Sequence, residues 1–322
     1  MSYDESQQPV RRPFGRSNLT VAVAALVPTA LAGWFVWQGI SGPGGDGPDA
    51  AAAAGAASQA SPTPTGHPAS PTSSTTSNNT EGTQGTQDDN TSGDTDPTGP
   101  LAGKVIVIDP GHNPRNRDHP TEINEPVDIG TTSKECDTTG TSTKSGYAEA
   151  TFTLDVSHRL RTLLQKEGAT VTFTHDDDRP FGPCVDERAR IGNKAKADAV
   201  VSVHADGSAP GNRGFHVILP ALVKGGEADT AAIVGPSRTL GEEIVAEFAR
   251  ATGSKPANYL GEGTGLDVRS DLGGLNLSTV PKVFLESGNM RDSKDAALLT
   301  DAKWRQKAAQ GLSDGISGFL LN

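Results

Sequence analysis

Residues 41–100 divide the chain, because they are built almost wholly from small and polar side chains. Glycine, proline, serine, threonine, asparagine, alanine and aspartate dominate this segment, and it shows no apolar periodicity. Such a segment has too little apolar surface to offset the conformational entropy that folding would cost. We therefore expect residues 41–100 to be a disordered linker and the folded domain to occupy residues 101–322.

A nearly charge-free apolar run covers residues 19–40, and it is long enough to cross a bilayer as a helix. Arginines precede the run, and two tryptophans lie near its far end, where aromatic rings favour the membrane interface. The positive-inside rule then places residues 1–18 in the cytoplasm and everything after residue 40 outside. The alternative is a secretory signal segment that is cleaved, and both interpretations export the remaining chain.

Composition excludes some classes of partner. The formal net charge of −11 argues against nucleic acid, because phosphate binding needs a basic face. The two cysteines, Cys136 and Cys184, are a candidate disulfide if the domain is exported and two thiols if it is cytosolic. There is no coiled-coil pattern, so we expect a monomer.

Within residues 101–322, short apolar runs alternate with helical patterns. The run from Lys104 to Asp109 is continuously apolar, as expected for a strand buried on both faces. Residues 148–167 carry apolar side chains at helical spacing, and Gly168 then ends the pattern. The other predicted strands are residues 170–174, 199–204, 214–219 and 282–286, and the other predicted helices are 186–197, 237–252 and 295–320. This alternation predicts an α/β domain with a single, mostly parallel, twisted sheet and helices on both faces.

Three of the predicted strands end in residues that can carry chemistry, and ligands collect at the carboxyl ends of strands in such sheets. The first strand leads into Asp109-Pro110-Gly111-His112, another ends at His204, and the last ends at Glu286. A histidine at a strand end is more often structural than a ligand. Two at comparable strand ends favour a zinc site, which needs three protein ligands and an open position when it is catalytic.

The residues alone leave the third ligand of that zinc site open. Glu149 lies in the first turn of a predicted helix, where the helix dipole by itself favours an acidic residue. The other candidates, Glu122, Glu125 and Glu135, belong to a polar segment without periodicity, residues 113–145. Such a segment would wall or cover the site.

Glu286 has two interpretations. A carboxylate at the end of an apolar strand is costly unless it is paired or exposed in a cleft. In the first interpretation it forms a salt bridge at the edge of the sheet. In the second it is a general base that takes a proton from the attacking water and passes it to a leaving amine.

Seven segments, taken in number and order, resemble the zinc-dependent N-acetylmuramoyl-L-alanine amidases, and secreted actinobacterial members most of all. They are VIVIDPGHNP (105–114), SGYAEATFTLDV (145–156), GPCVDERARIGN (182–193), VVSVHADG (200–207), RGFHVILP (213–220), VRSDLGGLNLSTVPKVFLESGNM (268–290) and the final helix up to Phe319. Together they span essentially all of residues 101–321. The resemblance to secreted members also suggests that Cys136 and Cys184 are disulfide-bonded.

The resemblance implies a zinc ion held by His112, Glu149 and His204, with Glu286 as the catalytic carboxylate. It implies that the substrate is peptidoglycan or a muropeptide. It also implies that the bond to be cleaved is the amide between the lactyl group of N-acetylmuramic acid and L-alanine of the stem peptide. The domain is then extracytoplasmic and faces the cell wall, either anchored by residues 19–40 or secreted after cleavage.

Four further polar residues are weaker candidates. Asp109 either orients a ligand histidine or bonds nearby backbone amides. Arg188 and Arg269 either meet carboxylates of the stem peptide or form ordinary surface pairs. Asn289, three residues beyond Glu286, is a candidate for binding the muramoyl group.

Two alternative functions remain open at this point. One is a zinc peptidase that cuts within the stem peptide, which product analysis would distinguish from an amidase. The other is a non-catalytic wall-binding or regulatory module, which would bind zinc without hydrolysing any muropeptide. The presence of all four key residues argues against the non-catalytic module.

Overall fold

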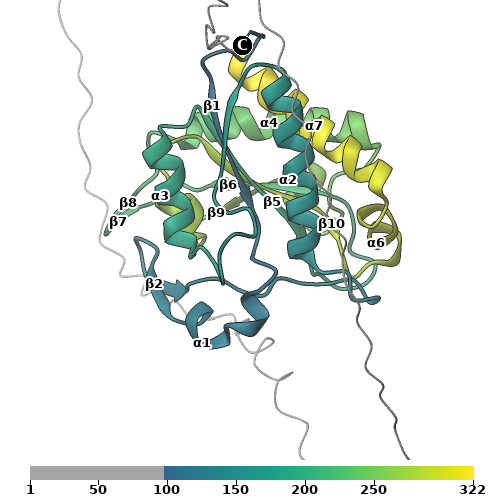
Figure 1. Cartoon of the computed structure of the whole chain (residues 1–322), viewed down its shortest axis with the longest axis horizontal. Coiled ribbons are helices and arrows are strands. Elements are labelled where there is room, and N and C mark those ends of the chain that lie inside the picture. Colours follow the sequence, from purple (N-terminus) through teal and green to yellow (C-terminus); the bar gives the residue numbers. More distant parts are fainter. Residues whose placement is uncertain (1–97) are drawn as a thin grey trace, which may run out of the picture. The chain divides into compact units, whose positions relative to one another are not determined.

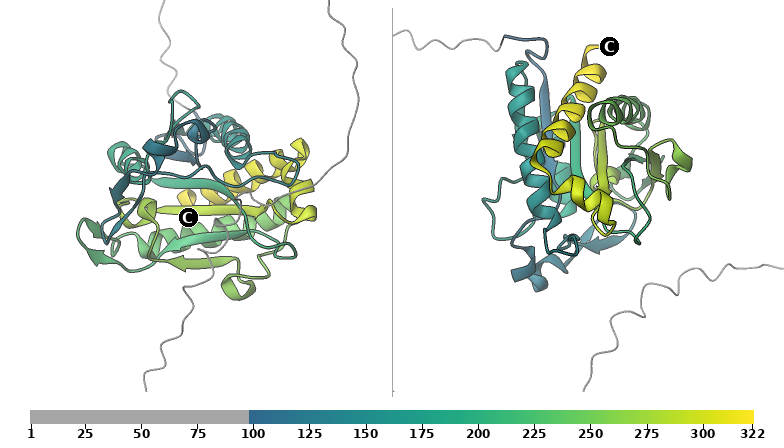
Figure 2. Two further views of the ribbon diagram at one scale, coloured as in Figure 1. Left: turned by 90° about the horizontal axis from the view of Figure 1, so that it is seen from below. Right: turned by 90° about the vertical axis from the view of Figure 1, so that its right-hand side faces the viewer.

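The computed structural model describes residues 98–322, which contain a six-stranded sheet in the order β4-β1-β5-β10-β6-β9 (Figure 1). The strands are β1 Val105–Pro110, β4 Thr170–Phe173, β5 Ala199–Asp206, β6 His216–Pro220, β9 Leu266–Arg269 and β10 Lys282–Asn289. Helices cover both faces of this sheet (Figures 1 and 2). The predicted α/β fold is confirmed.

Every strand pair in this sheet is parallel except β10 with β6, which is antiparallel. The apolar runs that predicted β1, β5 and β10 place these three strands side by side at the centre, with Ile108 opposite Val201 and Val201 opposite Val283. Because the three strands are parallel, their carboxyl ends meet at one edge of the sheet. That edge is where the sequence places its candidate chemistry.

One face of the sheet is apolar and is covered by three long helices: α2 Glu149–Lys166, α4 Val234–Thr252 and α7 Ala302–Leu321. Alternate side chains of the central strands point into this face and are fully buried, namely Ile106, Ile108, Val201, Val203, Val283 and Leu285. Two glycines let α7 approach α4 closely: a Cβ at Gly311 or Gly315 would lie 2.8 or 2.7 Å from a Cα atom of α4. This face forms the main core.

The opposite face is only partly apolar. Near the start of the strands, Val107 and Val200 pack against α3, which spans Val185–Ala195. In the next row towards the carboxyl ends the sheet carries buried polar groups, Asp109 and Ser202, which are paired in register. The short helix α5, Gly273–Asn276, contacts α3 on this side. The sheet therefore has one face packed with apolar side chains and one face that carries buried polar and ionised groups.

The long connection between β1 and α2 lies at the carboxyl edge of the sheet (Figure 1). It contains η1 Asn116–Asp118, α1 Pro120–Ile123 and the small antiparallel pair β2 Pro126–Asp128 and β3 Ser133–Glu135. Cys136, which follows β3, is disulfide-bonded to Cys184, the residue that precedes α3. The predicted pairing of the two cysteines is confirmed.

The prediction of one helix over residues 295–320 is wrong. The structure has two helices, α6 Ser293–Leu299 and α7, and the chain turns between them at Thr300 and Asp301. The Asp301 carboxylate accepts a hydrogen bond from the Trp304 amide at 2.7 Å and so begins a new helix. The remaining elements were not predicted either: β9, the outer pair β7 Lys224–Gly225 and β8 Ala228–Asp229, and η2 Gly261–Gly263.

The predictions for residues 1–18, 19–40 and nearly all of 41–100 lie outside the described residues. Within residues 98–322, no helix is both long and apolar enough to cross a membrane.

Candidate metal and catalytic site

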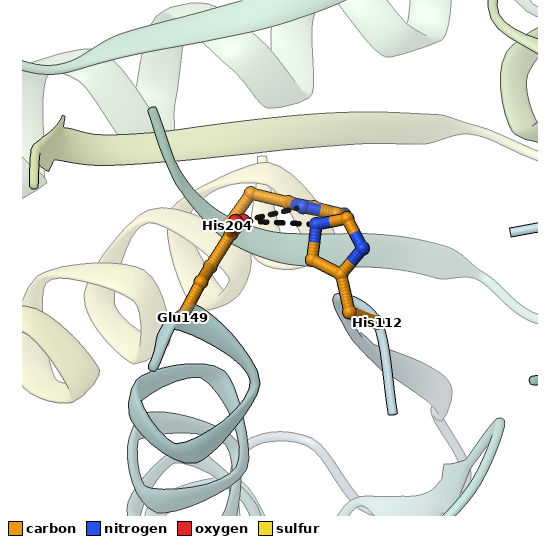
Figure 3. A group of neighbouring side chains, drawn as sticks. All are labelled: His112, Glu149 and His204. Carbon is orange, nitrogen blue, oxygen red and sulfur yellow. Dashed lines mark hydrogen bonds and ion pairs between the residues drawn. The ribbon is translucent and has the colours of Figure 1, made fainter. Parts of the chain in front are cut away.

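Three side chains from different elements converge at the carboxyl edge of the sheet: His112 after β1, Glu149 at the start of α2 and His204 on β5 (Figure 3). Each offers one ligand atom, and these atoms all lie within 4.8 Å of one another. Glu149 Oε1 is 3.2 Å from Nε2 of His112 and 3.0 Å from Nδ1 of His204. Among residues 98–322 these three are the group of histidine and carboxylate side chains that fits a metal ion.

The backbone at the end of β1 brings His112 close to His204. A Cβ at Gly111 would lie 2.4 Å from the His204 ring, so only glycine lets β1 pass this close to β5. The next residue, His112, has φ 60°, a left-handed conformation that a non-glycine residue adopts only under constraint. This turn directs the imidazole across the edge of the sheet towards β5.

Backbone amides orient the Glu149 carboxylate. Its Oε2 accepts a hydrogen bond from the Thr141 amide at 2.8 Å, and its Oε1 accepts one from the Ala205 amide at 3.2 Å. Gly140 lies directly against the site, because a Cβ there would be 2.7 Å from the His112 ring and 2.8 Å from Glu149 Oε2. The segment before α2 therefore packs onto the three side chains.

The electrostatics of the three residues favour a cation between them. Burial by itself would raise the pKa of Glu149, but the two histidines outweigh burial and hold that pKa well below its ordinary value. Burial would likewise lower the pKa of His112, and Glu149 and Asp137 raise it well above 6.5 instead. In both cases positive charge next to the Glu149 carboxylate is favoured.

The donor set fits zinc. Two imidazole nitrogens and one carboxylate oxygen are typical of catalytic zinc sites, which leave a fourth position open. Ligand atoms about 2 Å from a shared ion at tetrahedral angles would lie roughly 3.3 Å apart. The two separations of 3.2 and 3.0 Å are close to that spacing.

Glu286 lies on β10 directly opposite His204 of the neighbouring strand. Its Oε2 atom is buried and has no hydrogen-bond partner among the described residues. Burial, reinforced by the negative charges of Glu149 and Asp206, raises the pKa of Glu286 well above 4.5. Glu286 has no ion-pair partner among the described residues, so it does not match the salt-bridge interpretation.

A cavity of about 180 Å³ lies next to the two histidines. Its lining includes His112 and His204 together with the apolar side chains of Val185, Leu272 and Phe284. The Phe284 ring stacks on the His204 ring with their centroids 5.4 Å apart. A partly apolar cavity therefore borders the metal-binding group.

Comparison with known proteins identifies the family. The sequence profile described as N-acetylmuramoyl-L-alanine amidase matches residues 106–318. The chain belongs to this family. The predicted enzyme class, an N-acetylmuramoyl-L-alanine amidase and cell-wall hydrolase, is confirmed.

Mycobacterial members of the family are similar over most of their length. The N-acetylmuramoyl-L-alanine amidase Rv3717 of Mycobacterium tuberculosis is 43% identical over 220 residues, covering 68% of this chain and 88% of the relative. The crystal structure of the amidase Ami1 from Mycobacterium smegmatis matches with a TM-score of 0.63 and 40% identity, over 68% of this chain and 98% of that one. The apo form of Ami1 from Mycobacterium abscessus matches with the same score and identity, over 68% of this chain and 100% of that one.

The structure places two of the weaker candidates, Asp109 and Arg188, in one buried ion-pair network. Asp109 contacts neither a ligand histidine nor a local amide; its carboxylate pairs with Arg188 at 2.8 Å and with Lys282 at 3.0 Å. Hydroxyls of Thr174 and Ser202 also donate to it. Arg188 is 5% exposed, so it is neither a surface pair nor open to a peptide carboxylate.

Asn289 is not free to bind substrate. Its side-chain nitrogen donates to three backbone carbonyls, those of Ser208, Ala209 and Asn212, and its oxygen accepts from the Arg291 amide. It is fully buried and holds the loop after β5 in place. Arg269 matches the surface-pair alternative, because its guanidinium binds the Asp271 carboxylate with two hydrogen bonds of 2.8 and 2.6 Å.

Sequence reasoning missed Asp137 and Lys282. The Asp137 Oδ1 atom lies 3.4 Å from Nδ1 of His112, on the opposite side of the ring from Glu149. Lys282 opens the apolar strand β10 and is 1% exposed. A lysine at the head of a buried strand is a signal in the sequence, whereas nothing around Asp137 distinguishes it from the other acidic residues of its segment.

Proposed function

We propose that this chain hydrolyses the amide between the lactyl group of N-acetylmuramic acid and L-alanine of the stem peptide, with zinc as its metal. The observation that carries the proposal is the convergence of His112, Glu149 and His204 next to Glu286, in a chain of the amidase family. The zinc ligands in this proposal are the three converging residues. When bound, zinc polarises the scissile carbonyl and makes an attacking water more acidic.

Other residues of the chain transfer the proton and bind the substrate. Glu286 accepts the proton of the attacking water and later donates it to the departing nitrogen of L-alanine. Burial raises the pKa of Glu286, which favours the protonated form that donates to the departing nitrogen. The apolar hollow formed by Val185, Leu272 and Phe284 receives the part of the substrate next to the scissile bond.

The placement of the domain is also a proposal. The disulfide between Cys136 and Cys184 supports an extracytoplasmic location facing the cell wall, because such bonds persist in oxidising compartments. Residues 19–40 anchor or export the chain, residues 41–100 act as the linker, and residues 101–322 form the catalytic domain, which we expect to be a monomer.

The test is product analysis with the purified full chain and defined muropeptides. We expect an intact stem peptide with a free L-alanine amino group, no turnover after chelation, and recovery when zinc is added back. Cleavage inside the stem peptide would support the peptidase alternative. Stoichiometric zinc with no hydrolysis of any muropeptide would contradict the catalytic mechanism.

A further inference from the structure

The His112 ring is held on its Nδ1 side by oxygens from two consecutive residues, Asp137 and Thr138. Its Nδ1 atom lies 3.1 Å from the Thr138 carbonyl oxygen, 3.2 Å from the Thr138 hydroxyl and 3.4 Å from Asp137 Oδ1. A carbonyl and a carboxylate only accept hydrogen bonds, so Nδ1 must carry a hydrogen. The Nε2 atom, which faces Glu149, is then the atom with a lone pair for a metal.

Asp137 is itself fixed by Arg188. The Arg188 Nη2 atom donates to the Asp137 carboxylate at 2.9 Å, and both side chains are buried. The other guanidinium hydrogens are also used, on the Asp109 carboxylate and on the backbone carbonyls of Pro110, His112 and Pro183. Arg188 therefore holds the strained backbone of His112 directly and its ring through Asp137.

The disulfide joins the two segments that carry this ion pair. Cys136 immediately precedes Asp137, and Cys184 precedes α3, whose first turn contains Arg188. The Val185 amide also donates to the Cys136 carbonyl at 2.7 Å, so the two segments are joined covalently and by a backbone hydrogen bond. The link lies at the start of α3, on the side of the sheet away from the main core.

We propose that Asp137 is a positioning residue for the metal ligand His112, and that the Cys136–Cys184 disulfide keeps Asp137 in that position. The bridge then secures metal affinity in addition to the stability that any disulfide provides. This inference rests on the proposed zinc site. It predicts that reduction of the bridge weakens zinc binding in a protein that is still folded.

The first test is zinc affinity, measured by chelator competition on the full chain. Asp137→Asn removes the charge while keeping the size of the side chain, and we expect zinc to bind about 10- to 100-fold more weakly. Asp118→Asn changes an exposed carboxylate in the same connection and should leave the affinity unchanged. Wild-type affinity in folded Asp137→Asn would overturn the proposal, whereas a wild-type chain that binds no zinc would instead overturn the proposed function.

A second measurement separates positioning from general stability. In the zinc-loaded protein the Nδ1 hydrogen of His112 should give a proton NMR signal that exchanges slowly with water, and Asp137→Asn should speed that exchange. A purely structural role for Asp137 would leave this signal unchanged in folded protein.

The third test addresses the bridge with the double variant Cys136→Ser/Cys184→Ser, assayed below its unfolding temperature. We expect weaker zinc binding with retained secondary structure, and losses that are not additive with Asp137→Asn because both act through one contact. Additive losses, or unchanged affinity, would contradict the role of the bridge. If the double variant does not fold, the same comparison is made by mild reduction of the folded wild type.

Discussion

The two faces of the central sheet are built from the same strands but hold the fold in different ways. The face under α2, α4 and α7 is filled with aliphatic and aromatic side chains. The face under α3 contains Asp109, Arg188 and Lys282, all buried, with the Asp109 carboxylate paired to both cations. Hydrocarbon packing tolerates small changes of shape, whereas a buried charge network requires every partner to be present.

The difference shows where function can be placed in such a sheet. Successive rows on the polar face run from Val107 and Val200, through Asp109 and Ser202, to His204 and Glu286 at the carboxyl ends. The buried charges lie between the apolar packing and the open site. They place fully hydrogen-bonded polar groups directly behind His204 and Glu286, which aliphatic side chains cannot do.

The largest expected effect comes from two neighbours on β10 that point to opposite faces. Glu286→Gln should lower turnover by about 10²- to 10⁴-fold, because it removes the proton acceptor, while zinc content and stability stay near wild type. Leu285→Ala should destabilise the fold by about 2 to 5 kcal/mol and leave the folded fraction active. Activity assays and denaturant titrations on both variants check this, and a fully active Glu286→Gln enzyme would remove Glu286 from the mechanism.

The next largest effect should come from breaking the charge network. Asp109→Asn leaves Arg188 and Lys282 without their shared carboxylate, and we expect a loss of about 3 to 5 kcal/mol in unfolding free energy. Asp271→Asn breaks an exposed pair with Arg269 and should cost less than about 1 kcal/mol. Equal losses in denaturant titrations would mean that burial of the network has no energetic importance.

The same network gives a pH dependence. Burial would raise the pKa of Asp109, but Lys282 and Arg188 outweigh it and hold that pKa far below its ordinary 3.8. Because the folded pKa is the lower one, this stabilisation is complete above pH 3.8 and declines as the pH falls further. The stability gap between wild type and Asp109→Asn should therefore narrow from pH 7 to pH 3, and a constant gap would contradict the pairing.

A smaller effect is expected at Gly140, which packs against His112 and Glu149. Gly140→Ala should weaken zinc binding by about tenfold, corresponding to roughly 1.4 kcal/mol, because its methyl group displaces the ligands. Gly146→Ala is a matched control, since Gly146 also has a positive φ but a Cβ there meets nothing within 4 Å. The control should lose stability without losing zinc affinity, and calorimetric zinc titration distinguishes the two variants.

The smallest effect is expected on the apolar side, at the start of α7. Asp301→Ala removes the carboxylate that accepts from the Trp304 amide and should cost about 1 kcal/mol. Zinc affinity and turnover should not change, because α7 packs on the face away from the site. A change in zinc affinity would show that the two faces are more tightly coupled than their contacts indicate.

The apolar face was largely predictable from sequence, because its signal is a local run of aliphatic residues. The central strands β1, β5 and β10 follow directly from such runs. The break between α6 and α7 was missed because apolar residues continue on both sides of it, at Leu298, Leu299 and Trp304. The edge strand β9 was missed because it is short and only half-buried.

The polar face was predictable only in part. His112, His204 and Glu286 stand out as strand ends, but Glu149 looks like an ordinary acidic residue at the start of a helix, and the family resemblance was needed to select it. The sequence predicts that Arg188 either meets carboxylates of the stem peptide or forms an ordinary surface pair. Its actual partners, Asp109 and Asp137, lie 79 and 51 residues away in sequence, and no local pattern signals such pairing.

Helix α2 runs from the metal-binding group to the point where the described chain enters the domain. Glu149 begins this helix at the site, while the Glu167 carbonyl just past its other end accepts a hydrogen bond from the Leu101 amide, where the described chain enters the domain. An 18-residue helix is about 27 Å long, so the point of entry and the reacting centre lie on opposite poles. The last helix, α7, ends at the entry pole as well (Figure 1). Both ends of the described domain therefore lie at the pole away from His112, Glu149 and His204.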